Sequence, residues 1–220
     1  MNIYFNGNSS FLLETRKGRR ILLDPMELIE LKENINPNIN LVTISHNHKG
    51  QNLNSYFYDD TEILYTSTDF TNDFCSIKAI TSFHDNHNGQ KRGPNIIFKI
   101  NCDGYYLCHL GHLGHKLNDN IINSLKEIDI LFVPVGAYFT IGLKDLKNLI
   151  EEINPKYVIP MSYKIDKYSS YLKGLDSFLL KFKNYNYKKL DYLPLDKQPK
   201  YSTPLIIILD INKKKTLNSN

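Results

Sequence analysis

The pattern of apolar and polar positions changes about halfway along the chain. In the first half, short apolar runs are separated by tight turns, as in an antiparallel sheet. Glycine supports a hairpin turn in Arg16-Lys17-Gly18-Arg19, and Asp103-Gly104 is a strong two-residue hairpin signal. This half predicts strands over 11–14, 20–23, 41–44, 77–83, 95–101 and 105–108.

The second half alternates buried-strand runs with segments of helical spacing. Leu143, Leu146, Leu149 and Ile150 follow a helical period, and Pro155 ends that helix. Helices are predicted over 118–128, 143–153 and 171–182, and strands over 129–133, 157–159 and 205–209. Strands first and strand–helix alternation later suit two sheets packed face to face with helices outside. We therefore expect one domain over residues 1–211, and a polar tail over 212–220 that is disordered.

Composition narrows the class of protein. The hydrophobic fraction of 41% is ample for a sizeable core, and the net charge of +4 owes much to lysines near the C-terminus. Basic residues form no stripe interleaved with aromatic residues, so a nucleic-acid partner is not expected. Cys75, Cys102 and Cys108 are odd in number and lack metal-type spacing, which favours a reducing compartment. Since no run approaches the ~18 apolar residues of a spanning helix, we expect a cytoplasmic protein without a membrane partner.

Histidines gather just after predicted strands. They stand at positions 46, 48, 84, 87, 109, 112 and 115. His46 and His48 are two apart in a segment that leaves a strand, so both side chains leave on one face. His84, after the 77–83 strand, is the natural third ligand, because three neutral imidazoles and a water make a catalytic zinc site. Spacing alone supports a second interpretation equally well, in which these histidines only cap strand ends and bind no metal.

Several short motifs add to this reading because they occur in a fixed order along the chain. They are Leu23-Asp24-Pro25, Ser45-His46-Asn47-His48, Phe83-His84-Asp85, Arg92-Gly93 with Asn95, Cys108 to His115, Pro134 to Gly142, and Ile159-Pro160-Met161 with Tyr163-Lys164. With them, residues 1 to about 210 resemble the small metal-dependent hydrolase branch of the metallo-β-lactamase superfamily, related to ascorbate-6-phosphate lactonase. The resemblance implies an α/β fold, the four-layer αβ/βα sandwich.

The resemblance also implies a half-retained metal site. The family motif runs His-x-His-x-Asp-His, followed by a third histidine, a bridging aspartate and a last histidine. His46, His48 and His84 match the histidine ligands of the first metal. The second-metal positions are replaced by Gly50, Gln51, His112 and Ser162, and the family's N-terminal Gly-His is altered to Gly7-Asn8. We therefore expect at most one divalent ion, zinc or another first-row metal, and a degenerate second site.

His112 has three open roles. It could be a fourth ligand that closes the site, a general base in catalysis, or a side chain that fills space. A closed four-ligand site is structural, whereas an open three-ligand site is catalytic.

The residues around the histidines carry weaker expectations. Asp24 and Asp85 are expected to orient ligating histidines, and Arg92 and Asn95 to lie at the pocket rim or in an exposed turn. His109 is expected to be mainly structural, and His87 and His115 to be loop residues. A Cys108–His109 nucleophile pair is disfavoured, since adjacent strand residues point to opposite faces.

Two hypotheses for function follow. The first is a mononuclear hydrolase in which a hydroxide attacks an ester, lactone, amide or phosphodiester of an undisclosed small molecule. The second is a non-catalytic descendant that binds a ligand or forms a homo-oligomer or a pair with an active paralogue, with or without metal. A nucleic-acid-processing member is disfavoured, because the chain is too short for the inserted domain of such enzymes.

Overall fold

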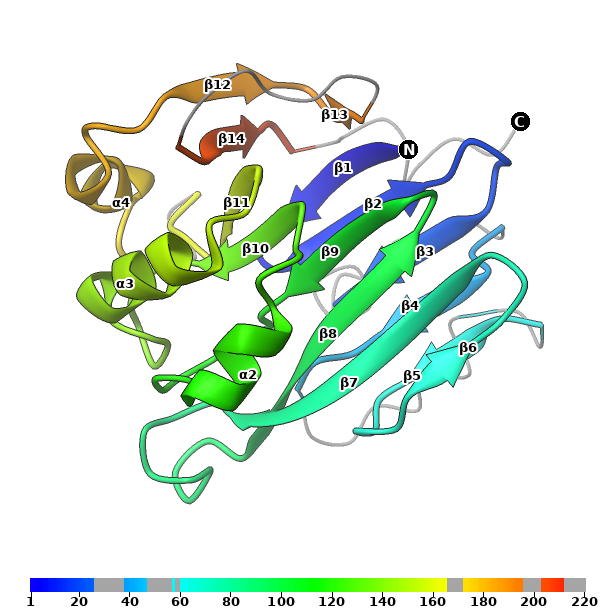
Figure 1. Ribbon diagram of the computed structural model, residues 1–220, viewed down its shortest axis with the longest axis horizontal. Helices are drawn as coiled ribbons and strands as arrows, with labels where there is room; N and C mark the ends of the chain where they lie inside the picture. Colours follow the sequence, from blue (N-terminus) through cyan, green and yellow to red (C-terminus); the bar gives the residue numbers. More distant parts are fainter. Residues whose placement is uncertain (26–37, 47–56, 58–59, 166–171, 196–202, 212–220) are drawn as a thin grey trace.

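Two β-sheets packed face to face form the body of the molecule (Figure 1). The computed structural model describes residues 1–25, 38–46, 57, 60–165, 172–195 and 203–211. The first sheet has the order β13-β1-β2-β3-β4-β5. Its strands are β1 (Asn2–Gly7), β2 (Ser10–Glu14), β3 (Arg20–Leu23), β4 (Leu41–Thr43), β5 (Glu62–Leu64) and β13 (Leu193–Pro194).

The second sheet has the order β12-β14-β11-β10-β9-β8-β7-β6. Its strands are β6 (Phe70–Thr71), β7 (Cys75–Phe83), β8 (Pro94–Cys102), β9 (Tyr105–His109), β10 (Ile130–Pro134), β11 (Tyr157–Met161), β12 (Tyr187–Leu190) and β14 (Leu205–Leu209). From β6 to β9 neighbouring strands pair antiparallel, and from β9 to β12 they pair parallel. The change from hairpins to crossovers matches the change predicted from the sequence.

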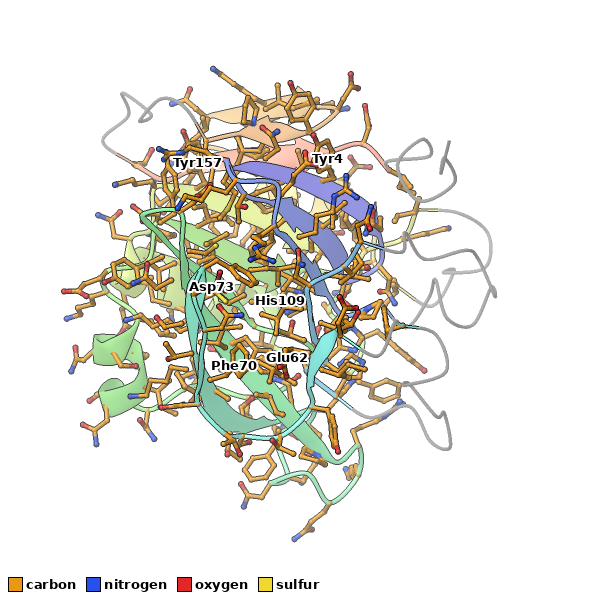
Figure 2. All side chains as sticks on the ribbon, turned by 90° about the vertical axis from the view of Figure 1, so that its right-hand side faces the viewer. Tyr4, Glu62, Phe70, Asp73, His109 and Tyr157 are labelled. Carbon is orange, nitrogen blue, oxygen red and sulfur yellow. The ribbon has the colours of Figure 1, made fainter. Side chains whose placement is uncertain are left out.

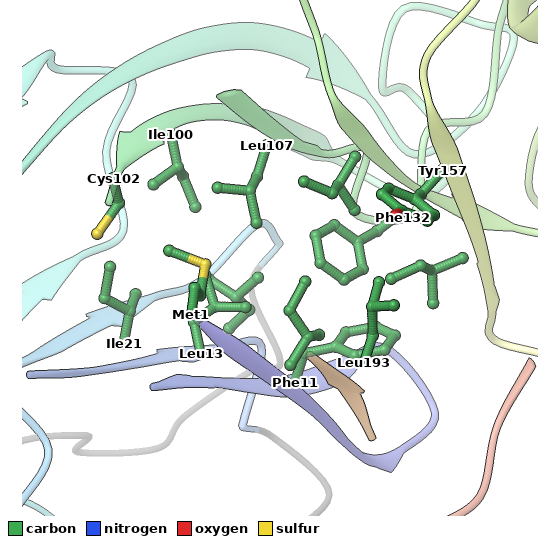
Figure 3. Packing of buried hydrophobic residues seen from close by; sticks show 14 of the residues in the cluster. Met1, Phe11, Leu13, Ile21, Ile100, Cys102, Leu107, Phe132, Tyr157 and Leu193 are labelled. Carbon is green, nitrogen blue, oxygen red and sulfur yellow. The ribbon is translucent and has the colours of Figure 1, made fainter. Parts of the chain in front are cut away.

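The main core lies between the sheets. Phe11 and Leu13 of the first sheet meet Leu107 and Phe132 of the second (Figure 3). Alternate residues point to the two faces of a strand, so the intervening positions pack outward. On the second sheet that outer face, with Leu131 and Val133 among its residues, forms a separate buried cluster with the helices.

Three helices cover this outer face: α2 (Asp119–Ser124), α3 (Leu143–Ile153) and α4 (Leu175–Lys181). Asn118 caps the start of α2, where its side chain accepts a hydrogen bond from Ile121 N. The predicted bounds of α3 are confirmed. Within the described part of the chain, no helix is long and apolar enough to cross a membrane.

The sandwich fold expected from the sequence is confirmed, with one qualification about its layers. All helices among the described residues lie on the second sheet. The outer face of the first sheet is also buried, at Tyr4, Leu12, Leu22 and Val42. Ile211 pairs with Phe5 in an isolated parallel bridge. The predicted tail at 212–220 lies outside the described residues.

Candidate metal centre

Three histidines from separate strand ends converge at one end of the sandwich. His46 follows β4, His84 follows β7, and His112 lies in the loop after β9. One ligand nitrogen from each lies within 4.8 Å of the others. His46 is buried and the other two are half-buried. Within the described residues, this is the one group of three or more potential ligands that could hold a metal ion. His48, the other predicted ligand, lies outside the described residues.

His112 is in direct contact with both other histidines. Its Nδ1 lies 2.9 Å from Nε2 of His84, and its ring stacks on that of His46 with centroids 4.1 Å apart. A hydrogen bond at this distance needs a proton on one of the two nitrogens. When both are deprotonated, they direct two lone pairs toward one region, as neighbouring metal ligands do. The contact therefore suits a ligand role for His112.

A buried relay fixes the ring of His46. Asp24 accepts hydrogen bonds from Ser45 N at 2.7 Å and from Ser45 Oγ at 2.5 Å. Ser45 Oγ is also 2.8 Å from Nδ1 of His46. The hydroxyl has one proton and gives it to the carboxylate, so it accepts from Nδ1–H of His46. The tautomer then leaves Nε2 as the nitrogen that His46 offers to a metal. Asp24 thus orients His46 through Ser45.

Two further polar residues hold the loop that carries His112. Asn95 is fully buried in β8; its Oδ1 accepts from His112 N at 2.8 Å, and its Nδ2 donates to Leu110 O at 3.0 Å. Ser162 Oγ lies 3.1 Å from Nε2 of His112. Gly111 allows this close packing, because a Cβ there would lie 2.4 Å from Asn95 Oδ1. Asn95 is therefore a positioning residue under the loop, and the alternative of an exposed turn is wrong for it.

Asp85 organises the loop after His84. Its buried carboxylate accepts hydrogen bonds from the backbone nitrogens of His87, Gly89, Lys91 and Arg92, at 2.7 to 3.0 Å. Burial alone raises the pKa of this carboxyl group, but the four backbone donors favour the charged form and lower the pKa to about 2. The predicted contact to a ligating histidine is not among these bonds, so Asp85 shapes the backbone that follows His84.

Arg92 is exposed, which agrees with both predicted alternatives, the pocket rim and the exposed turn. Its guanidinium carbon lies 3.3 Å from the ring centroid of Phe139. Phe139 belongs to the loop between β10 and α3, so this contact joins two loops at the histidine end of the sandwich.

His109 lies apart from the three-histidine group. It is fully buried between the sheets (Figure 2), where Nε2 contacts Ser9 O at 2.9 Å and Nδ1 accepts from Gly111 N at 3.2 Å. Burial lowers its pKa, because the imidazolium would lose its hydration; Asp24 and the Ser9 carbonyl oppose this shift. Its expected structural role fits these contacts.

His87, His115 and Cys108 are also outside the three-histidine group. Nε2 of His115 accepts from Phe83 N at 3.1 Å, and Nε2 of His87 lies 2.9 Å from Lys91 Nζ. Cys108 packs in the helix-side cluster, where burial raises its thiol pKa. Since His109 contacts residues on the other side of the sheet, the two do not form a nucleophile pair.

A cavity of about 850 Å³ lies at the opposite end of the sandwich. Hairpin turns line it, including Gly18, Asp73 and Asp103, and its lining contains no histidine. We place the candidate centre at the histidines, because only there do the described residues offer convergent metal ligands.

The family assignment comes from comparison with known proteins. The family described as the beta-lactamase superfamily domain matches residues 2–162. The chain belongs to the metallo-β-lactamase superfamily. The predicted resemblance is confirmed, and the two-sheet architecture is the fold of this superfamily.

Relatives and solved structures agree with this assignment. A UPF0173 metal-dependent hydrolase of Methanosarcina mazei is 27% identical over 195 residues, covering 74% of this chain and 83% of the relative. One of Carboxydothermus hydrogenoformans is 24% identical over 192 residues, covering 74% and 84%. The crystal structure of a candidate zinc-dependent hydrolase of the superfamily from Thermotoga maritima superimposes with a TM-score of 0.74 and 30% identity, covering 95% of this chain and 99% of that one.

From the sequence, His112 and Ser162 are predicted to occupy the positions of the family's bridging aspartate and last histidine. In the structure their Nε2 and Oγ atoms lie 3.1 Å apart. Gly50 and Gln51, the other two positions of that prediction, lie outside the described residues.

Proposed function

We propose that this protein is a metal-dependent hydrolase with a single metal ion held by His46, His84 and His112. The observation that carries the proposal is the convergence of three imidazole nitrogens within 4.8 Å. Imidazole suits zinc and other first-row divalent ions. The choice of a single ion rests on the predicted replacement of the second-metal ligands, His112 and Ser162 among them.

The residues that contact the three histidines also suit a bound ion. Ser45 and Asp24 give His46 a defined tautomer, and Asn95 and Ser162 hold His112 at its backbone and at Nε2. Outer partners of this kind commonly matter about 10- to 100-fold for metal affinity or activity. Such support favours a ligand role for His112 over the roles of general base or filler.

If His46, His84 and His112 hold a divalent ion, it would supply a coordinated water with a pKa lowered to about 7 and a Lewis acid for a carbonyl or phosphoryl oxygen. The chain's residues hold and orient the ligands, while Ser162 Oγ adds a proton donor or acceptor beside His112. The reaction class that follows is hydrolysis of an ester, lactone, amide or phosphodiester. His48 is the remaining predicted ligand; with it the site has four protein ligands, and without it an open position.

Metal analysis tests the proposal directly. Protein purified without added metal is expected to carry about one equivalent of metal per chain, and His46→Ala, His84→Ala and His112→Ala are each expected to lose it. His87→Ala is the matched control, a nearby histidine outside the group, and should keep the metal. Two equivalents of metal, or full retention in His112→Ala, would contradict the proposed site.

A non-catalytic descendant is the alternative function. Turnover by protein that binds one metal, measured in the native chain and in His48→Ala, separates the two functions. A three-ligand catalytic site predicts hydrolysis of generic esters or phosphodiesters whether or not His48 is present. A closed structural site predicts no turnover in the native protein while the metal stays bound.

A further inference from the structure

Backbone hydrogen bonds hold Arg92 next to His84, a proposed metal ligand. Its backbone nitrogen donates to Asp85 at 2.7 Å, and His84 N donates to Gly93 O at 3.1 Å. Both bonds tie the chain at Arg92 to the chain at His84. The side chain therefore projects from a rigid part of the loop that carries this ligand.

The ring of Phe139 stacks on the flat face of the Arg92 guanidinium group. The guanidinium carbon lies 3.3 Å from the ring centroid of Phe139, and the ring of Tyr138 packs against Phe139 with centroids 4.0 Å apart. Stacking uses the flat face and leaves the in-plane N–H donors pointing outward. Among the described residues, no side-chain hydrogen bond or ion pair of Arg92 is found.

The loop that carries Phe139 is itself tied to the histidine end. Ile141 N donates to Leu113 O at 2.7 Å, next to His112. Gly136 packs so closely on Ser162 that a Cβ there would lie 2.2 Å from the Ser162 carbonyl oxygen. Phe139 has a φ of +56°, a rare conformation for a bulky residue, and such outliers persist where surrounding contacts enforce them. Arg92 and Phe139 thus form a bridge between the loop that follows β7 and the loop that precedes α3.

The charges near this bridge favour an anion. The carboxylate of Asp85, in the same loop as Arg92, is buried and bound to four backbone nitrogens. Asp145, at the start of α3, is paired with Lys116 at 3.2 Å. Lys91, the neighbouring cation, directs its Nζ to His87 Nε2 at 2.9 Å. Arginine with its in-plane donors exposed matches the geometry of a carboxylate or phosphate.

We propose that Arg92 determines the specificity of this site by binding an anionic group of the substrate, a carboxylate or a phosphate. Phe139 acts as a positioning residue that keeps the guanidinium plane in place. The inference rests on the proposed hydrolase function for its consequence on turnover. The anion site itself can be measured without turnover.

The binding test uses metal-free protein, so that the anion cannot bind the metal. Inorganic phosphate and glutarate are titrated separately by calorimetry, which distinguishes a phosphate site from a carboxylate site. Arg92→Gln is expected to weaken binding of the preferred anion at least about tenfold, the contribution of one hydrogen-bonded charged pair. Lys91→Gln removes the same charge one residue away and should change binding far less. Arg92→Lys and Phe139→Leu should fall between.

The kinetic test compares two esters with one leaving group, mono-p-nitrophenyl glutarate and p-nitrophenyl acetate, on metal-loaded protein. Arg92→Gln should lower the ratio of kcat/KM for the anionic ester to that for the neutral ester about tenfold, mainly through KM. An unchanged ratio, with both esters hydrolysed, overturns the inference and leaves the hydrolase proposal standing. Anion binding that depends on Arg92, without turnover of either ester, supports the anion site and contradicts the hydrolase proposal. No binding of either anion to the native protein, or equal loss in Lys91→Gln, also overturns the inference.

Discussion

Ser45 is the residue that connects a buried charge to a proposed metal ligand. Oδ2 of Asp24 lies 3.8 Å from Nδ1 of His46, which is too far for a direct hydrogen bond. The Ser45 hydroxyl lies between these two atoms. The carboxylate therefore acts on the imidazole through one intermediate oxygen. A sequence gives little warning of such a relay, because Ser45 looks like an ordinary residue at a strand end.

Removing this hydroxyl should weaken metal binding without removing a ligand. In Ser45→Ala, Nδ1 of His46 loses its acceptor, so the ring is no longer held in the tautomer that presents Nε2. We expect metal affinity to fall about 10- to 100-fold, in the range of other outer-shell losses. Competition with a chromophoric chelator measures the change. Ser124→Ala, a serine at the end of α2, is the control, and equal losses in both variants would contradict the relay.

The sequence predicts the site at this scale only in part. Clustered histidines after strands are visible, and His46, His84 and His112 are indeed brought together. Asn95 is predicted at the pocket rim or in an exposed turn, and it lies fully buried beneath the His112 loop. Ser45 and the partner role of Ser162 are missed, because hydroxyl contacts depend on packing between segments far apart in sequence. The one available signal was Gly111, which marks a close backbone approach.

The strand ends explain why the histidines meet. β4 belongs to the first sheet, whereas β7 and β9 belong to the second, and all three end at the same end of the sandwich. His46 therefore faces His84 and His112 across the gap between the sheets. Asn95 in β8 extends the same principle, since it lies between β7 and β9 and reaches both.

His109 joins β9 to the turn between β1 and β2, and it should make stability depend on pH. Because the folded protein lowers its pKa, the unfolded chain takes up a proton on this side chain first. Its contribution is present above the unfolded pKa of about 6.5 and is lost as the pH falls below that value. In His109→Gln we expect lower stability at neutral pH but a shallower loss between pH 7 and 5.

Urea unfolding at several pH values measures this effect in metal-free protein. The slope of unfolding free energy against pH should decrease in the variant by up to one proton. A variant with the native slope would show that His109 titrates alike in both states.

Elements with strong local signals were predicted well, and those without were not. α3 and β14 have the predicted bounds, and the Asp103-Gly104 hairpin joins β8 to β9 as expected. The helix predicted over 118–128 ends at Ser124, where Leu125 N bonds back to Ile122 O in a tighter turn and Lys99 Nζ donates to Ser124 O. Short edge strands such as β13 and β6 were missed, since two residues carry no period.

At the scale of the whole molecule, a metal at this site would link the two sheets. His46 comes from the first sheet, and His84 and His112 from the second. An ion bound by all three can hold the sheets together only in the folded chain, since unfolding separates the ligands. Binding to the folded state alone raises stability in proportion to the logarithm of free metal over its Kd.

Removing the metal should therefore lower the melting temperature. At free zinc of 100 times Kd the stabilisation is about 2.7 kcal/mol, which for a domain of this size corresponds to about 5–10 °C in Tm. Scanning calorimetry with EDTA, and then with zinc restored, measures the shift. His46→Ala loses the link between the sheets. Its Tm before EDTA is added should therefore be lower than that of the native protein, and EDTA should not change it. An equal EDTA shift in His46→Ala would place the stabilising metal elsewhere, and no shift in the native protein would favour the metal-free descendant.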